Sequence, residues 1–230
     1  MADEFRRLRA NVYVDGFNFY YGCFKNRNRP QWRPYKWLDL DAFIRKVFPA
    51  YEISRIRYFT APVHPSPDDP NKPVRQQTYL RALRTLPLLT VHLGRFAIRA
   101  RRRRLADPRS FDPPYTPIYT DPIKTVGVIQ EEEKGSDVNL ASYLLIDGFN
   151  DEYDVAIVVS NDSDLAEPIR LTREKLGRQV ILLNPRRNTA IDLQGVADYQ
   201  RVVRLGPIKS SQFLDRLEDA NGTFSKPGTW

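Results

Sequence analysis

Apolar and polar blocks alternate regularly through the second half of the chain. Residues 155–159 form an unbroken apolar, mostly β-branched run, which is typical of a parallel strand buried on both faces. Hydrophobic periodicity predicts further strands over residues 180–183 and 201–205, and helices over residues 137–146 and 164–176. Strands that alternate with helices in this way indicate an α/β domain with a parallel, doubly wound sheet.

The helix over residues 137–146 has a serine directly before it. Ser136 is therefore predicted to cap this helix, and Gly177 is predicted to end the helix over residues 164–176.

The first half of the chain has a less regular pattern. Strands are predicted over residues 11–15 and 53–63, helices over 38–48 and 74–85, and a strand or hairpin arm over 88–100. Residues 107–122 contain five prolines and predict a loop. We expect one domain over residues 1–210 with a basic, proline-rich insertion at about 95–122, followed by a C-terminal helix or tail over 211–230.

Positive charge is concentrated at the start of this insertion. The chain carries a net charge of +8, and six arginines fall within residues 95–104. This stretch is either a solvated strand edge that discourages strand pairing or a surface that binds an anionic partner. The backbone of a nucleic acid would relieve the repulsion between four consecutive arginines.

The composition limits the kinds of site and location that we expect. One cysteine, Cys23, excludes an internal disulfide and a site with several thiolate ligands, and two histidines disfavour a His-rich metal site. No apolar run is long enough for a transmembrane helix, and the N-terminal residues lack the apolar segment of a signal peptide. We therefore expect a cytoplasmic protein that does not bind membranes.

Acidic residues occur where the predicted strands end and where one helix begins. Asp15 ends the first strand, Asp162 and Asp164 follow the central strand, and Asp137 opens a helix. Because sites in open parallel sheets form at the carboxyl ends of the strands, these four carboxylates are predicted to converge. Taken singly, each could instead serve as a turn residue or a helix cap.

Converging carboxylates need a cation, since otherwise they repel each other and take up protons. Oxygen ligands without histidine or thiolate suit Mg²⁺ or Mn²⁺, and such ions near a phosphate support displacement at phosphorus. Asn18 could orient the attacking water or the phosphate. The aromatic residues Phe17, Tyr20 and Tyr21 either stack on bases or belong to the core. Residues 131–133 are expected to be a solvated acidic run, one member of which could reach the site.

Three motifs carry a resemblance to a known family. They are VYVDGFNFYYG, EEKGSDVNLASYLL and VVSNDSDLAEPIRL, in this order along the chain. Together they resemble the NYN-domain family of PIN-like ribonucleases. The resemblance implies a three-layer, PIN-like (Rossmann-like) α/β fold with a mainly parallel central sheet, and RNA cleavage that depends on Mg²⁺ or Mn²⁺. It places the acidic residues of the family on Asp15, Asp137, Asp162 and Asp164, and its polar site residue on Asn18.

The leading hypothesis is a metal-dependent ribonuclease, most simply an endoribonuclease, that acts on single-stranded or structured RNA. DNA is a compatible substrate, a homo-oligomer is a compatible state, and one or two metal ions fit the motifs. The residues expected to bind nucleic acid are Arg99, Arg101, Arg102, Arg103, Arg104, Lys134, Arg186 and Arg187. The alternative is a nucleic-acid-binding or regulatory module with a metal-binding acidic pocket and no cleavage. A receiver-like phosphoacceptor domain fits less well, because the first strand supplies one aspartate and the central strand two.

Overall fold

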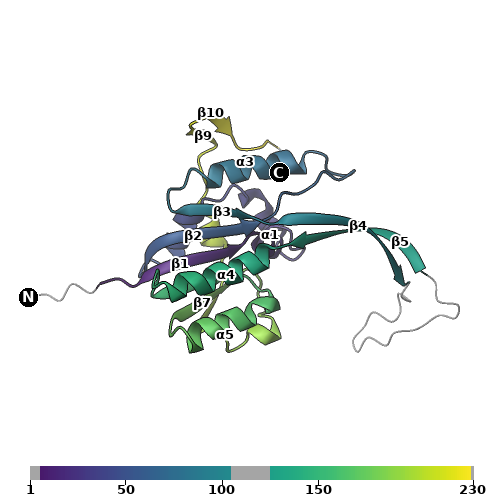
Figure 1. Ribbon diagram of the computed structural model, residues 1–230. Helices are drawn as coiled ribbons and strands as arrows, with labels where there is room; N and C mark the ends of the chain where they lie inside the picture. The colour runs from purple at the N-terminus through teal and green to yellow at the C-terminus, as the bar shows by residue number, and fades with distance from the viewer. Residues whose placement is uncertain (1–5, 105–124, 229–230) are drawn as a thin grey trace, which may run out of the picture.

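A six-stranded parallel sheet forms the centre of the molecule (Figure 1). The structure is a computed structural model that describes residues 6–104 and 125–228. The sheet order is β3-β2-β1-β6-β7-β8, and every neighbouring pair is parallel. Its strands are β1 (Arg9–Asp15), β2 (Glu52–Thr60), β3 (Leu89–Leu93), β6 (Val155–Val159), β7 (Gln179–Asn184) and β8 (Tyr199–Val202). The predicted α/β fold with a parallel central sheet is confirmed.

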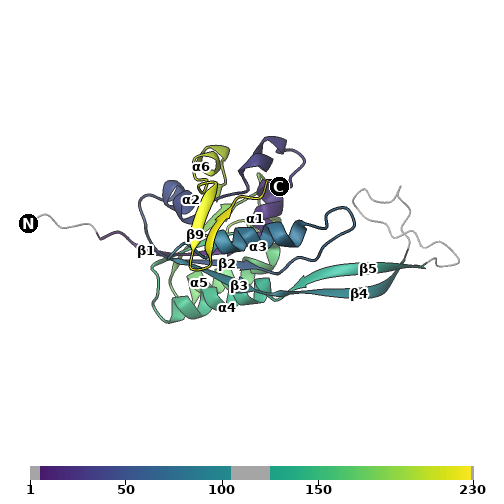
Figure 2. The same cartoon turned by 90° about the horizontal axis from the view of Figure 1, so that it is seen from above.

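Helices cover both faces of this sheet, which gives three layers (Figures 1 and 2). One face carries α1 (Gly16–Cys23), η1 (Pro30–Tyr35), α2 (Leu40–Val47), α3 (Lys72–Leu83) and α6 (Leu205–Lys209), and the other carries α4 (Ser136–Phe149) and α5 (Ala166–Glu174). Short 3₁₀ turns are η3 (Ser163–Leu165) and η4 (Ile191–Leu193). No helix in the described parts of the chain is both long enough and apolar enough to cross a membrane.

The strand β1 shows why the sheet needs a cover on each face. Val12 and Val14 join the hydrophobic cluster on the side of α1, whereas Tyr13 between them joins the cluster on the side of α4. The strand β6 is fully buried and pairs with both β1 and β7. A strand with two buried faces must be apolar at successive positions, which explains the run that the sequence displays.

The arginine-rich stretch is a strand in a two-stranded ribbon, called the arm below. The arm consists of β4 (Arg95–Arg104) and β5 (Thr125–Lys134), paired antiparallel, and it projects from the body of the molecule (Figures 1 and 2). The single strand or hairpin arm predicted over residues 88–100 is in fact two separate elements. The strand β3 belongs to the central sheet, and β4 belongs to the arm. The sequence did not predict β5. The proline-rich loop over 107–122 lies outside the described residues.

The C-terminal segment contains a small hairpin rather than a helix or a frayed tail. Its strands are β9 (Arg216–Asp219) and β10 (Gly222–Ser225). Arg81 of α3 donates to both carboxylate oxygens of Asp219, at 2.8 and 2.6 Å, and its guanidinium lies 4.2 Å from the centre of the Phe224 ring. These contacts hold the hairpin on α3. The division of the chain at residue 210 stays a prediction.

The start of α4 also differs from the prediction. The helix begins at Ser136 itself, and the residue at the cap position is Gly135, with a φ of 93°. A left-handed conformation of this kind favours glycine. Ser136 instead donates its backbone N–H and its hydroxyl to the carboxylate of Glu133, at 3.1 and 2.6 Å. Glu133 therefore performs the capping that we expected of Ser136.

A buried ion pair fixes α4 on the sheet. Arg57 of β2 donates to both carboxylate oxygens of Asp147, at 2.7 and 2.8 Å, and the Tyr13 hydroxyl donates to the same carboxylate at 2.8 Å. The guanidinium lies 4.2 Å from the centre of the Tyr143 ring, which belongs to α4. This network joins β1, β2 and α4 in the core.

Replacement of Asp147 by alanine should destabilise the fold strongly. The change leaves the Arg57 guanidinium buried without its carboxylate, which costs about 3–5 kcal/mol of unfolding free energy. Asp41→Ala is the control, because it breaks a more exposed ion pair with Arg45 and should cost less than about 1 kcal/mol. Urea unfolding measures both values. Similar losses for the two variants would show that the network contributes no special stability.

Candidate metal centre

The Asp15 carboxylate is held where β1 ends and α1 begins. One of its oxygens accepts a hydrogen bond from the Asn18 backbone N–H at 2.9 Å, and the other accepts from the Ser160 hydroxyl at 2.8 Å. The residue is only 4% exposed. Burial raises the pKa of Asp15 to about 7 against these two hydrogen bonds, and the charges of Asp137 and Asp162 add to the rise. A cation beside this carboxylate would offset the cost of its charge.

A glycine allows α1 to start so close to the sheet. A Cβ on Gly16 would lie 2.6 Å from the Tyr58 ring and 2.8 Å from the Phe59 carbonyl oxygen. Only glycine fits this approach without a shift of the backbone. The sequence Asp-Gly at the end of β1 therefore reflects packing as well as chemistry.

The loop after β6 delivers Asp162 to the same edge. Its backbone N–H donates to the Ser160 hydroxyl at 3.0 Å, and its carboxylate accepts from the Asp164 N–H at 3.1 Å. The side-chain oxygen of Asn18 accepts from the Asn161 N–H at 3.0 Å. Asn18 thus ties this loop to α1. Of the two aspartates, Asp162 caps the following turn, η3.

Asp137 comes to the site from the first turn of α4. It is half-buried, and burial raises its pKa to about 6. The charges of Asp162, Glu133 and Asp164 contribute to this rise, in decreasing order. The loop after β6 and the start of α4 bring their carboxylates close together, with oxygens of Asp137 and Asp162 within 4.8 Å of each other.

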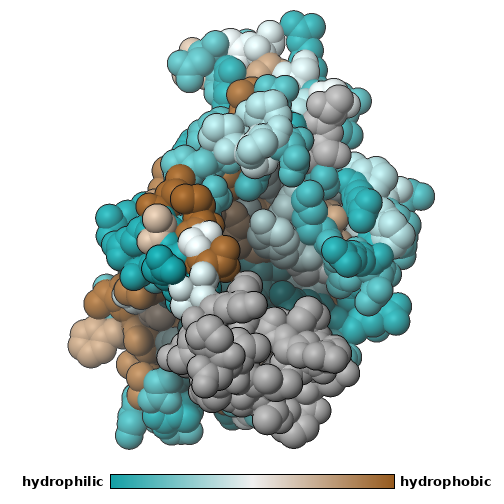
Figure 3. Space-filling view, turned by 90° about the vertical axis from the view of Figure 1, so that its right-hand side faces the viewer, coloured by the Kyte–Doolittle hydropathy of each residue, from teal (hydrophilic) through white to brown (hydrophobic). Residues whose placement is uncertain are grey.

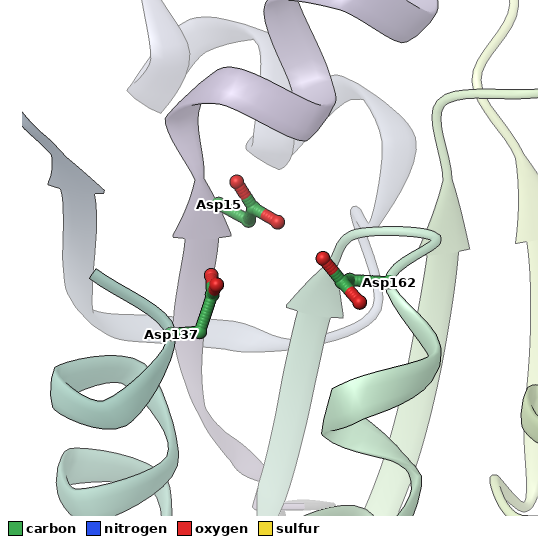
Figure 4. Close-up of side chains that lie close together, drawn as sticks. All are labelled: Asp15, Asp137 and Asp162. Atoms are coloured by element: carbon green, nitrogen blue, oxygen red, sulfur yellow. The ribbon is translucent and has the colours of Figure 1, made fainter. Parts of the chain in front are cut away.

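Asp15, Asp137 and Asp162 point toward one another from three separate elements (Figure 4). Each offers an oxygen, and these oxygens lie within 4.8 Å of one another. Among the described residues, none of the three forms an ion pair with a lysine or arginine. A set of oxygen donors with unneutralised charge fits a hard divalent cation.

The fourth predicted acid, Asp164, lies at the margin of this group. Its side chain is exposed, and its carboxylate is not one of the oxygens within 4.8 Å. Its charge still raises the pKa of Asp137. The hypothesis that Asp164 binds a metal stays a prediction.

The three carboxylates open into a cavity of about 460 Å³. Figure 3 looks onto this side of the molecule, where hydrophilic and hydrophobic surfaces meet at a hollow. The other lining residues are Phe17, Asn18, Tyr21, Lys72, Phe96, Glu131, Glu133 and Arg186. Phe17 stacks on Tyr21 with ring centres 6.5 Å apart, and it meets Phe96 edge-on at 5.5 Å. One wall of the cavity is thus aromatic.

Comparison with known proteins identifies the family. Residues 9–204 match the NYN domain, which is most of the chain. The chain belongs to the NYN domain family. This NYN domain is 30% identical over 247 aligned residues to 6-hydroxy-3-succinoylpyridine 3-monooxygenase HspA of Pseudomonas putida (strain DSM 28022 / S16), an alignment that covers 97% of this chain and 75% of the relative.

A solved structure has the same fold as this NYN domain. It is a protein of unknown function from Vibrio parahaemolyticus RIMD 2210633, matched with a TM-score of 0.53 and 16% identity. The match covers 89% of this chain and 96% of that chain. Together with the parallel sheet, it confirms the predicted PIN-like fold class.

The basic residues predicted to bind nucleic acid in this NYN domain lie in two places. Arg99, Arg101 and Arg103 share one face of β4, because side chains alternate along a strand. Arg102 points to the other face and donates to the Thr125 hydroxyl at 2.8 Å. The side chain of Arg104 lies outside the described residues.

The remaining predicted basic residues are nearer the carboxylates. Arg186 lines the cavity, and Arg187 follows it in an exposed loop after β7. Lys134 ends β5 and forms an ion pair with Glu132. The cavity therefore has Arg186 at its wall, whereas the arm carries its arginines farther out.

The sequence missed two of the cavity residues and only partly predicted two others. No sequence motif marked Lys72 or Phe96 as a site residue. They line the cavity because the fold brings α3 and β4 to it. Glu131 and Glu133 were expected in a solvated run of which one member could reach the site, and both line the cavity. They share one face of β5, so recognition of that strand would have separated them from Glu132.

Divalent-cation binding should strengthen as pH rises through about 6 to 7. Protons compete with the cation on Asp137 and Asp15, whose pKa values are raised to about 6 and about 7. In chelator, a raised folded-state pKa also means that stability falls as pH rises from about 4 toward 7. Calorimetric titration with Mn²⁺ from pH 5 to 8 measures the affinity. An affinity independent of pH would contradict this assignment. The control is Asp192→Asn, which changes an exposed aspartate in η4 and should leave the affinity and its pH dependence as in the wild type.

Proposed function

We propose that this protein is a metal-dependent nuclease that hydrolyses phosphodiester bonds in RNA with Mg²⁺ or Mn²⁺. The observation that carries the proposal is the group formed by Asp15, Asp137 and Asp162, whose oxygens lie within 4.8 Å of one another at the wall of an open cavity. Membership of the NYN family supports a nuclease-type site. The predicted fold and the positions of the acids agree with this chemistry.

We propose separate roles for the acidic residues and for Asn18. Asp15, Asp137 and Asp162 would hold the cation. When bound, Mg²⁺ or Mn²⁺ supplies an activated water and neutralises charge on the phosphate. Asn18 keeps the loop that carries Asp162 against α1, so its role is to position the site. Asp164 would contact the cation through a water molecule, because its carboxylate is not among the oxygens that lie within 4.8 Å of one another.

The cavity wall also suits a nucleic-acid strand. Lys72 and Arg186 provide positive charge beside the carboxylates, and Phe17 and Tyr21 offer aromatic surface for a base. Arg99, Arg101 and Arg103 carry positive charge on the face of the arm opposite to Phe96, Glu131 and Glu133, so they would bind a part of the nucleic acid that lies outside the cavity. An endonuclease fits this open arrangement, and a DNA strand would meet the same groups.

Replacement of Asp162 by asparagine should abolish cleavage. The change keeps the size of the side chain and removes one charged ligand, so the rate should fall at least about 100-fold. End-labelled RNA with Mn²⁺ measures the rate, and the chelated wild type should match the variant. Asp192→Asn, an exposed aspartate on η4, should cleave normally. Binding of RNA and DNA without cleavage by the wild type would favour the alternative of a binding module.

A second candidate function is hydroxylation of a substituted pyridine. It is favoured by the 30% identity to 6-hydroxy-3-succinoylpyridine 3-monooxygenase, which extends over 97% of this chain. The aromatic wall of the cavity is compatible with a flat ring. Oxygen uptake that requires both 6-hydroxy-3-succinoylpyridine and a reductant, without RNA cleavage, would replace the nuclease proposal with this one.

The arm should contribute salt-sensitive affinity for RNA. Replacing Arg101 to Arg104 by alanine removes the run of charge and should weaken binding. For a single strand, the slope of log affinity against log salt should fall by about 0.7 for each phosphate that the variant no longer neutralises. Fluorescence anisotropy in chelator at several salt concentrations measures the slope. An unchanged slope would mean that the run is only a solvated edge. The control is Arg84→Ala, which removes an arginine after the end of α3 and should leave the slope unchanged.

A further inference from the structure

The arm joins the body of the molecule directly beside the candidate metal centre (Figure 1). Strand β5 ends at Lys134 and α4 begins at Ser136, so Gly135 alone separates the arm from the helix that carries Asp137. With so short a connection, the base of the arm and the first turn of α4 cannot move independently. The position of Asp137 therefore depends on the contacts that fix this junction.

Glu133, near the end of β5, makes the contacts that fix the junction. Its carboxylate accepts hydrogen bonds from the Ser136 backbone N–H at 3.1 Å and from the Ser136 hydroxyl at 2.6 Å. The same hydroxyl oxygen lies 3.5 Å from a carboxylate oxygen of Asp137. Hydrogen bonds to a carboxylate are stronger than those between neutral groups, and Ser136 is only 2% exposed. Glu133 thus holds the residue that precedes Asp137 at two atoms.

A glycine lets the arm come this close to α4. Gly94 connects β3 to β4, and its N–H donates to the Thr60 carbonyl oxygen at the end of β2, at 2.7 Å. A Cβ on Gly94 would lie 2.6 Å from the Lys134 carbonyl oxygen and 2.8 Å from a carboxylate oxygen of Glu133. Any side chain at this position would therefore displace Glu133 or the base of the arm.

The other strand of the arm supports Glu133 from the side of α1. Phe96 of β4 pairs with Glu133 across the arm, and its ring meets Phe17 edge-on with ring centres 5.5 Å apart. Phe17 lies in the first turn of α1, two residues after Asp15. The base of the arm therefore contacts α1 close to Asp15 and α4 close to Asp137.

We infer that Glu133 is a positioning residue of the metal centre, a role that rests on the proposed function. By holding the start of α4 against the base of the arm, it fixes the Asp137 carboxylate relative to the other two acids. Glu133 acts through Ser136 rather than as a ligand, because both of its oxygens bind Ser136 and neither is among the oxygens within 4.8 Å of one another. Groups that orient metal ligands typically contribute about 10- to 100-fold to metal affinity.

Calorimetric titration of the full chain with Mn²⁺ tests this role. Glu133→Ala removes both bonds to Ser136 and should weaken Mn²⁺ binding about 10- to 100-fold. Glu133→Gln should bind Mn²⁺ nearly as the wild type does, because its amide group can still bond both Ser136 atoms although the charge is gone. The control is Glu132→Ala, which removes a negative charge from the opposite face of β5 and should leave the affinity unchanged.

Two results would overturn the positioning role of Glu133. Equal losses in Glu133→Ala and Glu133→Gln would show that the charge of Glu133, or direct ligation, carries the effect. Wild-type affinity in Glu133→Ala, together with a lower Tm in chelator, would show that Glu133 contributes only to stability.

A second experiment changes the position of Glu133 and leaves every charge in place. Gly94→Ala should weaken Mn²⁺ binding, because the added methyl group displaces Glu133 or the base of the arm. Gly127→Ala is the matched control, since a Cβ at this position of β5 meets no atom within 4 Å, and it should bind Mn²⁺ as the wild type does. Wild-type affinity in Gly94→Ala would contradict the positioning role.

Failure of this role and failure of the proposed function give different results. If the wild type binds no Mn²⁺, the metal centre itself is rejected, and the role of Glu133 with it. If the wild type binds Mn²⁺ and all the variants bind equally well, only the role of Glu133 is rejected. Neither experiment measures cleavage, so a protein that binds Mn²⁺ without cutting RNA still tests the role of Glu133.

Discussion

Repulsion among three carboxylates is the constraint on which the candidate site depends. Asp15 and Asp162 accept hydrogen bonds from neutral donors, namely the Ser160 hydroxyl and backbone N–H groups, and the Asp137 carboxylate lies 3.5 Å from the Ser136 hydroxyl. Neutral donors fix the positions of the oxygens without cancelling their charge. Burial raises the pKa values of Asp15 and Asp137, and the charges of the neighbouring acids add to the rise. A site built in this way keeps its negative charge for a ligand.

A buried network in the core helps to fix the positions of the carboxylates. Asp137 and Asp147 belong to the same helix, α4, one in its first turn and the other near its end. The ion pair between Asp147 and Arg57 fixes the far end of the helix on β2, and the Tyr13 hydroxyl connects it to β1. Since β1 also carries Asp15, one buried network relates two of the three acids. Stability of the core and precision of the site therefore share a cause.

Sequence patterns predicted the elements whose burial is strong and left out those whose burial is weak. The strand β6 and the acids at the strand ends follow from local runs and from the rule for parallel sheets. The strand β5 has most of its residues exposed, so its period of two gives little hydrophobic contrast. It exists through pairing with β4, and such distant pairing is not encoded in a local window.

The separation of opposite charges distinguishes a binding site from a stabilising ion pair. Arg57 and Asp147 neutralise each other in the core, whereas the three carboxylates have no such partner among the residues that the structure describes. If Lys72 or Arg186, which line the cavity, paired with the carboxylates, the fold would gain stability and the cavity would lose its affinity for a cation. Carboxylates without a cationic partner, in a cavity that Lys72 and Arg186 also line, are the pattern expected for a ligand that carries both a metal and phosphates.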